Sequence, residues 1–216
     1  ACAVWGYDFQ DMKSTDFPTF IARCFSNVFS PLLVPTYGMV LALTITVLSF
    51  LPTGIKLSVL GVAFLTTGVI PIITIVALWR LHYISSPRLT ERRERIWPYG
   101  ITVVSYLCCA YWLWRANAPM WLWGFPAGGA LALAAIVAIS FRWKISAHSA
   151  GMGGLCAEMM AIATSNVAVG DNMLLWFAAA VVLAGCVMTS RLVLERHTLW
   201  QTLAGFALGF VCVAVF

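Results

Sequence analysis

Long stretches without any Lys, Arg, Asp or Glu side chain are the feature of this 216-residue sequence that most restricts its fold. Four of them cover residues 24–55, 57–79, 96–114 and 116–141, and a fifth covers residues 197–216. A helix needs about 20 apolar residues to cross roughly 30 Å of hydrocarbon. Each stretch is therefore long enough for a membrane-spanning helix.

The composition is typical of a membrane protein. Apolar residues make up 62% of the sequence, charged residues only 10%, and the mean hydropathy is +0.91. A soluble domain carries about a quarter charged residues to cover its core, so that class is excluded. Disorder, a coiled coil and a disulfide scaffold are excluded on the same grounds. The net charge of +5 suits lipid headgroups or phosphate, and we expect no nucleic-acid partner.

We predict an all-α, polytopic transmembrane helix bundle of about six to seven spans, with an active site at one membrane face. Continuous apolar runs favour helices over a barrel, whose strands would alternate. Residues 145–190 contain only two charged residues, and the turn-forming Gly170-Asp171-Asn172 divides them into two spans. The expected spans are 31–52, 57–80, 98–115, 119–142, 150–168, 172–190 and 197–215.

The first thirty residues differ from the rest of the chain. Residues 1–30 mix aromatic and charged side chains, and Phe17 to Phe29 predict an amphipathic helix lying at the membrane interface. Met12-Lys13 resembles a natural start, so we expect residues 1–11 to be foreign to the natural chain. Residues 31–216 then form the transmembrane domain.

Basic residues gather on one predicted face of the membrane. The N-terminal segment and the loops after the second, fourth and sixth spans share that face and hold eleven of the thirteen Lys and Arg residues. Only Lys56 and Arg115 lie on the other face. The positive-inside rule explains much of this bias and predicts a cytoplasmic location for the basic face. It leaves unexplained why His148 and His197 stand at helix ends in these loops, where a bundle can assemble a polar site.

Three loop motifs occur in order on this face. They are Arg88-x6-Arg95, then Ser146-Ala147-His148, then Ser190-Arg191-x5-His197-x3-Gln201. Their order and spacing resemble those of the type 2 phosphatidic acid phosphatase superfamily, the integral-membrane lipid phosphate phosphatases. The signatures of that family are Lys-x6-Arg-Pro, Pro-Ser-Gly-His and Ser-Arg-x5-His-x3-Asp. The resemblance covers roughly residues 80 to 210.

The resemblance implies metal-independent hydrolysis of a lipid-linked phosphate, with no cofactor, through a phosphohistidine intermediate. His197 would be the nucleophile, His148 the general acid and then base, and Gln201 the group that orients His197. The phosphate-binding residues would be Arg88, Arg95, Ser146, Ala147 and Arg191. The expected partners are a lipid phosphate substrate and membrane lipids, and the expected location is the plasma (inner) membrane, although family members often work on its outer face.

The residue types suit this chemistry independently of the resemblance. A phosphate ester carries about two negative charges, and catalysis of its transfer rests on positioning and preorganised cations. Guanidinium forks match phosphate oxygens, and a helix beginning after Ser146 would add backbone N–H donors. On a helix beginning near residue 197, Gln201 lies one turn further along the same face, where it can fix the tautomer of His197.

Some positions depart from the family pattern. Ile96 stands where the family has proline, so a shifted register would give the role of Arg95 to Arg92 or Arg93. Gln201 replaces an aspartate and predicts a slower enzyme. It also keeps open an alternative, a non-catalytic phospholipid-binding or lipid-transport relative. Glu158, inside a predicted span, is interpreted as a neutral hydrogen-bonding side chain; a transporter that uses this carboxyl is a third reading.

Overall fold

A computed structural model of the chain describes residues 16–86, 94, 96–170 and 172–216. Arg88, Arg95 and the alternative pair Arg92 and Arg93 lie outside the described residues, as does the expected foreign segment 1–11.

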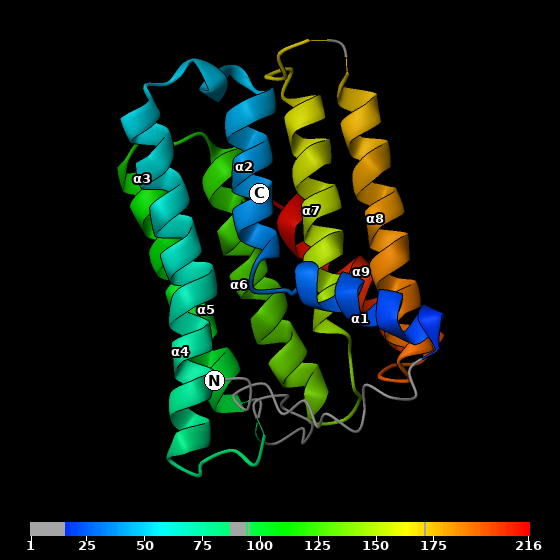
Figure 1. Cartoon of the computed structure of the whole chain (residues 1–216). Coiled ribbons are helices and arrows are strands. Elements are labelled where there is room, and N and C mark those ends of the chain that lie inside the picture. The colour runs from blue at the N-terminus through cyan, green and yellow to red at the C-terminus, as the bar shows by residue number, and fades with distance from the viewer. Residues whose placement is uncertain (1–15, 87–93, 95, 171) are drawn as a thin grey trace.

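The described residues form a bundle of helices without strands, which confirms the predicted all-α class (Figure 1). Four helices are long and apolar enough to cross a membrane: Thr53–Arg80, Ile96–Arg115, Met120–Ser140 and Met173–Val193. The chain is therefore an integral membrane protein. The helices are α1 (Phe17–Val28), α2 (Val34–Ile45), α3 (Thr53–Phe64), α4 (Ile70–Arg80), α5 (Ile96–Arg115), α6 (Met120–Ser140), α7 (Ala147–Thr164), α8 (Met173–Val193) and α9 (Leu199–Ala214).

The predicted first span, 31–52, is broken in the structure. Helix α2 ends at Ile45, and a short 3-10 helix, η2, follows at Val47–Phe50. Between them Thr46 is extended and pairs with Ala168 in an isolated antiparallel bridge. The backbone N–H of Val169 donates to the Ile45 carbonyl at 2.7 Å. This tertiary pairing competes with continued helical bonding and ends α2 early.

The second span runs without interruption from α3 to α4 but contains a π-helical segment, η3 (Leu65–Val69). Pro71 follows directly, in the first turn of α4. Proline has no N–H, and its ring collides with the carbonyl four residues before it, here that of Thr67. The wider π turn accommodates the proline without ending the helix.

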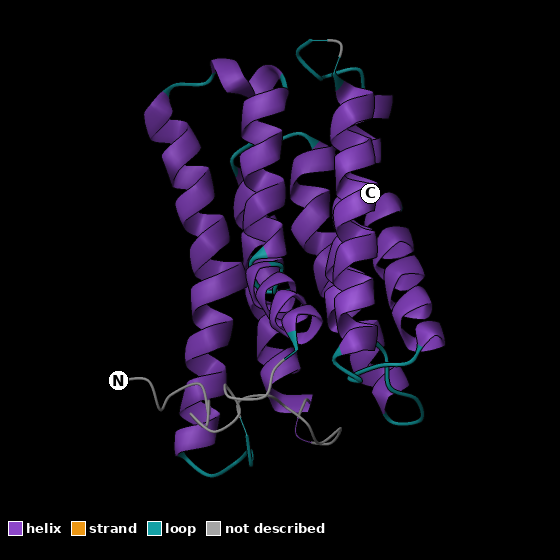
Figure 2. Cartoon of the chain, turned by 45° about the vertical axis from the view of Figure 1, so that its right-hand side comes forward, coloured by secondary structure: helices purple, strands orange, loops and turns teal. Residues whose placement is uncertain are grey.

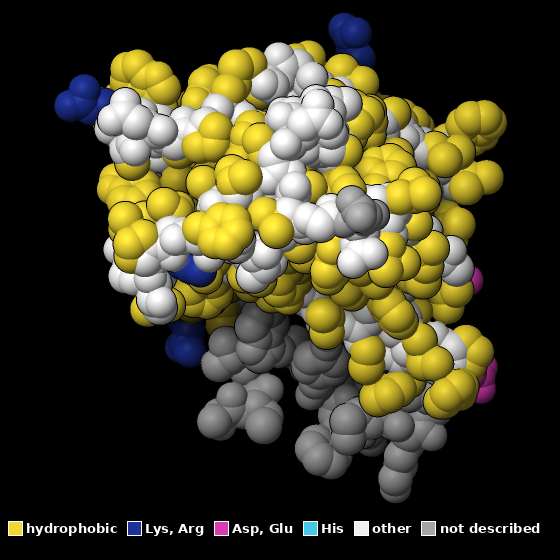
Figure 3. All heavy atoms as spheres, turned by 90° about the horizontal axis from the view of Figure 1, so that it is seen from above, with side chains coloured by type: hydrophobic (Ala, Val, Ile, Leu, Met, Phe, Trp, Pro, Cys, Tyr) yellow, Lys and Arg dark blue, Asp and Glu magenta, His cyan; other side chains and the backbone are white. Residues whose placement is uncertain are grey.

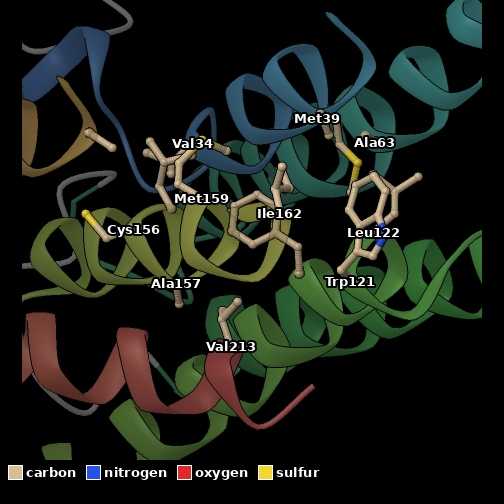
Figure 4. Packing of buried hydrophobic residues seen from close by; sticks show 14 of the residues in the cluster. Val34, Met39, Ala63, Trp121, Leu122, Cys156, Ala157, Met159, Ile162 and Val213 are labelled. Atoms are coloured by element: carbon tan, nitrogen blue, oxygen red, sulfur yellow. The ribbon is translucent and has the colours of Figure 1, made fainter. Parts of the chain in front are cut away.

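Helix α7 lies at the centre of the bundle. Its side chains Met159 and Ile162 are fully buried, and Figure 4 shows them among residues of the surrounding helices, including Leu122 of α6 and Val213 of α9. Helix α7 is rich in Ala and Gly and does not qualify as a membrane span by hydropathy, although it is the helix most enclosed by protein.

Glycines set the spacing between α7 and α9. A side chain at Gly153 would collide with the backbone carbonyl of Phe206, and one at Gly209 would collide with that of Ala150. A Cβ at Gly205 would lie 2.6 Å from the Ser146 carbonyl oxygen. These glycines therefore let α7 and α9 pack closely together. Because α8 runs back between them in the chain, the N-termini of α7 and α9 lie at the same end of the bundle (Figure 1).

The two ends of the bundle differ in charge, as the loop pattern predicts. Helix α1 and the turns after α4, α6 and α8 lie at one end, whereas the turns after α2 and α7 lie at the other (Figures 1 and 2). Figure 3, which looks onto that second end, shows mostly hydrophobic and uncharged atoms with few Lys or Arg side chains. The end with α1 is called the basic end below.

Candidate functional site

Two of the residues singled out in the sequence meet at the basic end. His148 lies in the first turn of α7, and Arg191 lies in the last turn of α8. Both contact Ser26 of α1. The guanidinium Nη1 of Arg191 donates to Ser26 Oγ at 2.6 Å, and His148 Nε2 donates to the Ser26 carbonyl at 3.1 Å. Nε2 also lies 3.4 Å from Ser26 Oγ. Two donors from different helices therefore converge on one position.

Burial and charge hold His148 in its neutral form. Loss of solvent lowers the pKa of His148 to about 3, and the nearby Arg191 guanidinium acts in the same direction. The Ser26 hydrogen bond opposes this shift, whereas His197 adds a smaller lowering effect. His148 lies outside the four candidate membrane spans. Because His197 contributes to the shift, it belongs to the same electrostatic neighbourhood as His148.

A helix cap orients His197. Its Nδ1 lies 3.2 Å from Gln201 Oε1, and the backbone N–H of Thr198 donates to the same Oε1 at 3.2 Å. Helix α9 begins at Leu199, with Thr198 and Gln201 forming a capping box. The expected contact between Gln201 and His197 is present, but the helix begins at Leu199, so His197 precedes it instead of lying in its first turn. The contact comes from a side chain that reaches back to the cap.

Because Gln201 Oε1 contacts both His197 and the backbone of Thr198, it shows which nitrogen of the His197 ring carries the proton. A backbone N–H donates only to an acceptor, so the Gln201 atom that Thr198 contacts is the amide oxygen. That oxygen cannot donate, and His197 Nδ1 must therefore carry the proton. The lone pair of the imidazole then lies on Nε2, the nitrogen that faces away from Gln201.

Ser146, which is predicted to bind phosphate, is buried in the structure. It is fully buried, and its Oγ accepts bonds from the Ser149 backbone at 3.3 Å and the Ser149 hydroxyl at 3.0 Å. Its first role is thus to cap α7. Its backbone N–H donates to the Gln201 carbonyl at 3.3 Å, which ties the start of α7 to α9. Phosphate binding by Ser146 and by the amide of Ala147 stays a prediction.

The first motif lies largely beyond the described part of the chain, which omits Arg88 and Arg95. Glu94 is described: its carboxylate accepts bonds from the backbone and hydroxyl of Ser85 at 2.9 and 3.0 Å. Within the described ranges, no group of three His, Cys, Asp or Glu side chains could hold a metal ion. Metal independence stays a prediction.

Glu158 does not match its interpretation as a hydrogen-bonding side chain. The residue is 1% exposed, and neither carboxyl oxygen has a hydrogen-bond partner among the described residues. The side chain lies in the α7 core, where small and apolar residues surround the helix.

Ser26 is the site residue that sequence reasoning missed. The signal was present in α1, where the small residues Ala22 and Ser26 are buried four positions apart while Phe17 and Phe20 are exposed. Small residues at helical spacing in a phenylalanine-rich helix indicate the face that packs against protein.

An apolar cavity of about 70 Å³ adjoins the start of α7. It begins beside Ala147, passes Gly151 and Gly154 of α7, and lies against Tyr99 of α5 and Ile136 of α6. One residue of the second motif therefore lines an apolar space within the bundle.

The fold and this site together define an integral membrane helix bundle with a cluster of Arg191 and two histidines, His148 and His197, at its basic end. No protein-family model, curated protein or solved structure matches the chain.

Proposed function

We propose that the protein is a lipid phosphatase that hydrolyses a lipid-linked phosphate, a phosphomonoester or a diphosphate, through a phosphohistidine on His197. The observation that carries this proposal is that Arg191 and His148 both donate to oxygens of Ser26. The distances are 2.6 Å from Arg191 Nη1 to Ser26 Oγ and 3.1 Å from His148 Nε2 to the Ser26 carbonyl oxygen. A phosphate group needs such a cluster of donors, with a nucleophile beside it.

In the first step, the Nε2 lone pair of His197 attacks phosphorus while the bond between phosphorus and the leaving oxygen breaks. His148 gives a proton to that oxygen, so the lipid leaves as an alcohol. Arg191 binds the charged equatorial oxygens throughout, because a guanidinium stays charged and matches their geometry. Arg88 and Arg95 would complete this set of cations.

In the second step, water attacks the phosphohistidine and the N–P bond breaks. His148, now neutral, accepts the water proton, and phosphate leaves while His197 regains its lone pair. Throughout, Gln201 holds the proton of His197 on Nδ1, which keeps Nε2 available for the phosphoryl group.

The low pKa of His148 is compatible with its action as an acid in the first step and as a base in the second. The imidazole is neutral because it is desolvated and faces a guanidinium. A bound phosphate dianion reverses the sign of the local charge and favours the imidazolium. His148 would thus become an acid only when substrate is present.

The position of the site at the end of an apolar bundle supports a lipid as the substrate. A phosphorylated headgroup would sit among Arg191, His148 and His197, with its hydrocarbon in the membrane. The cavity beside Ala147 offers apolar surface to the part of the lipid nearest the headgroup. A phosphatidate, a phosphatidylglycerol phosphate, an isoprenyl diphosphate and a phosphorylated lipid A all have this form.

The test is phosphate release from these four lipids by purified protein. We expect at least one to be hydrolysed, and His197→Ala to lose roughly 1000-fold or more of that activity. His82→Asn is the matched control, since His82 is exposed on the same end and its positive φ of 61° suits asparagine. Equal release by wild type and His197→Ala would exclude the mechanism.

A second candidate function is favoured by Gln201, whose neutral amide offers no charge to an imidazolium. In this alternative the protein binds or moves phospholipid through the same cluster of Arg191 and the two histidines, without hydrolysis. Binding of a lipid phosphate that Arg191→Gln weakens, with no release of phosphate from any substrate, would support it.

A further inference from the structure

Helix α1 lies across the basic end of the bundle, in front of the ends of α7 and α8 (Figure 1). It packs mainly against α8, and its buried residues are Ala22 and Ser26. Its opposite side is apolar and exposed: Phe17 is 75% and Phe20 58% accessible. An amphipathic helix of this kind rests at a membrane interface with its apolar side toward lipid.

Ser26 presents two oxygens to the two donors of the site. Its Oγ accepts from Arg191 at 2.6 Å, and its carbonyl accepts from His148 at 3.1 Å. A phosphate ion bound by the same donors would place its own oxygens there. The serine therefore occupies the position at which the proposed function needs substrate.

We propose that Ser26 is an internal occupant of the phosphate site and that α1 is a lid which the phosphate group of a lipid displaces. This inference rests on the proposed function, because it takes Arg191 and His148 as the phosphate-binding donors. Ser26 would then set the affinity of the site for its substrate.

The exchange is physically reasonable in both directions. The serine oxygens accept hydrogen bonds from the guanidinium of Arg191 and from the imidazole of His148. A phosphate dianion offers charged acceptors, whose hydrogen bonds are about twice as strong as those of neutral ones. A displaced α1 can keep its apolar side in the lipid interface, and what it loses is the packing of Ala22 against the bundle and the contacts of Ser26.

Two substitutions with opposite expected effects test the lid. Ser26→Ala removes the Oγ acceptor and should lower KM for a hydrolysed lipid phosphate by about tenfold. Ser26→Asp places a carboxylate between Arg191 and His148 and should raise KM by about tenfold or more. Cys24→Ala, an equally small truncation on the exposed side of the same helix, should leave KM unchanged. A rise in KM for Ser26→Ala would show that Ser26 helps to bind phosphate and would overturn the proposal.

Hydrogen exchange of the α1 amides tests the lid without reference to catalysis. Arg191→Gln should increase exchange across residues 17–28 severalfold in the absence of any lipid, because Ser26 loses its charged donor. Arg142→Gln, an exposed arginine at the same end, is the control and should not change it. Unchanged exchange in Arg191→Gln would overturn the lid.

Adding phosphatidate to the wild-type protein in detergent completes the experiment. Bound phosphatidate should increase α1 exchange, as Arg191→Gln does. Binding with unchanged or decreased α1 exchange would overturn the lid. If none of the four lipid phosphates binds, the proposed function fails instead, and the Arg191→Gln result still reports separately whether Arg191 holds α1 in place.

Discussion

His197 and Gln201 are joined by an Nδ1–Oε1 contact of 3.2 Å that belongs to the cap of α9. The oxygen that fixes the imidazole also accepts the backbone N–H of Thr198 at 3.2 Å. One amide therefore controls both where the helix begins and which nitrogen of the imidazole carries the proton. A substitution at position 201 must change both properties together.

The first prediction concerns the charge at this position. Gln201→Glu preserves the length and the acceptor and adds a negative charge beside His197, which favours the imidazolium-like phosphoenzyme. We expect phosphate release to be about tenfold faster, or ~1.4 kcal/mol in the barrier, when single-turnover rates are compared. Gln201→Met, of similar length without an acceptor, should be slower than wild type. A Glu variant slower than wild type would contradict the role assigned to Gln201.

The second prediction is a dependence of stability on pH. The pKa of His148 falls from 6.5 to about 3 on folding, so the unfolded chain binds more protons in this window. Stability should therefore decrease as the pH falls below about 6.5. Thermal unfolding at neutral pH and at about pH 5 should show a smaller difference for His148→Gln than for wild type. Identical pH dependence of the two proteins would argue against a buried neutral imidazole.

The third prediction tests the close packing that brings the second and third motifs together. Gly209→Ala forces a Cβ against the Ala150 carbonyl, and overpacking of this kind costs about 1–3 kcal/mol. We expect a lower melting temperature and reduced phosphate release, because α9 moves away from α7. Gly185→Ala on α8, where a Cβ meets nothing within 4 Å, is the control. Equal effects of the two variants would exclude this packing as the cause.

The fourth prediction concerns the unpartnered carboxyl of Glu158. A buried polar group without a hydrogen bond costs about 1–3 kcal/mol, so Glu158→Met should raise stability by a similar amount. Phosphate release should persist, since Glu158 contacts none of the site residues by hydrogen bond in the described structure. Loss of release with normal folding would assign a chemical role to this carboxyl.

The fifth prediction is the side of the membrane on which the site lies. The positive-inside rule places the basic end in the cytoplasm. Arg142, after α6, is exposed at that end, so Arg142→Cys places a thiol there, away from the apolar side of α1. A membrane-impermeant maleimide should therefore label it only after cells are permeabilised, as read by mass spectrometry of the peptide that contains position 142. The wild-type chain, with Arg at this position, is the control for the assignment, and labelling in intact cells would place the site on the outer face.

Much of the fold could be predicted from charge and hydropathy because these act locally along the chain. An apolar run of about 20 residues must form a helix in lipid, whatever it packs against. The gap between Lys56 and Arg80 predicts a helix that the structure extends from Thr53 to Arg80. The same hydropathy pattern predicts one unbroken span over residues 31–52, whereas the structure breaks it at Thr46. This break depends on the pairing of Thr46 with Ala168, which is remote in sequence.

The sequence by itself determined that this protein is a membrane helix bundle, the order of its motifs and the difference in charge between its two membrane faces. Each of these follows from where charged residues interrupt apolar ones. Only the tertiary structure decided that Ser26 lies against Arg191, 165 residues away, and that Ser146 serves as a buried cap. The Ser26 contact depends on how α1 crosses α8, and the burial of Ser146 depends on the close approach of α7 and α9 that their glycines allow. No local pattern specifies the register of either helix pair.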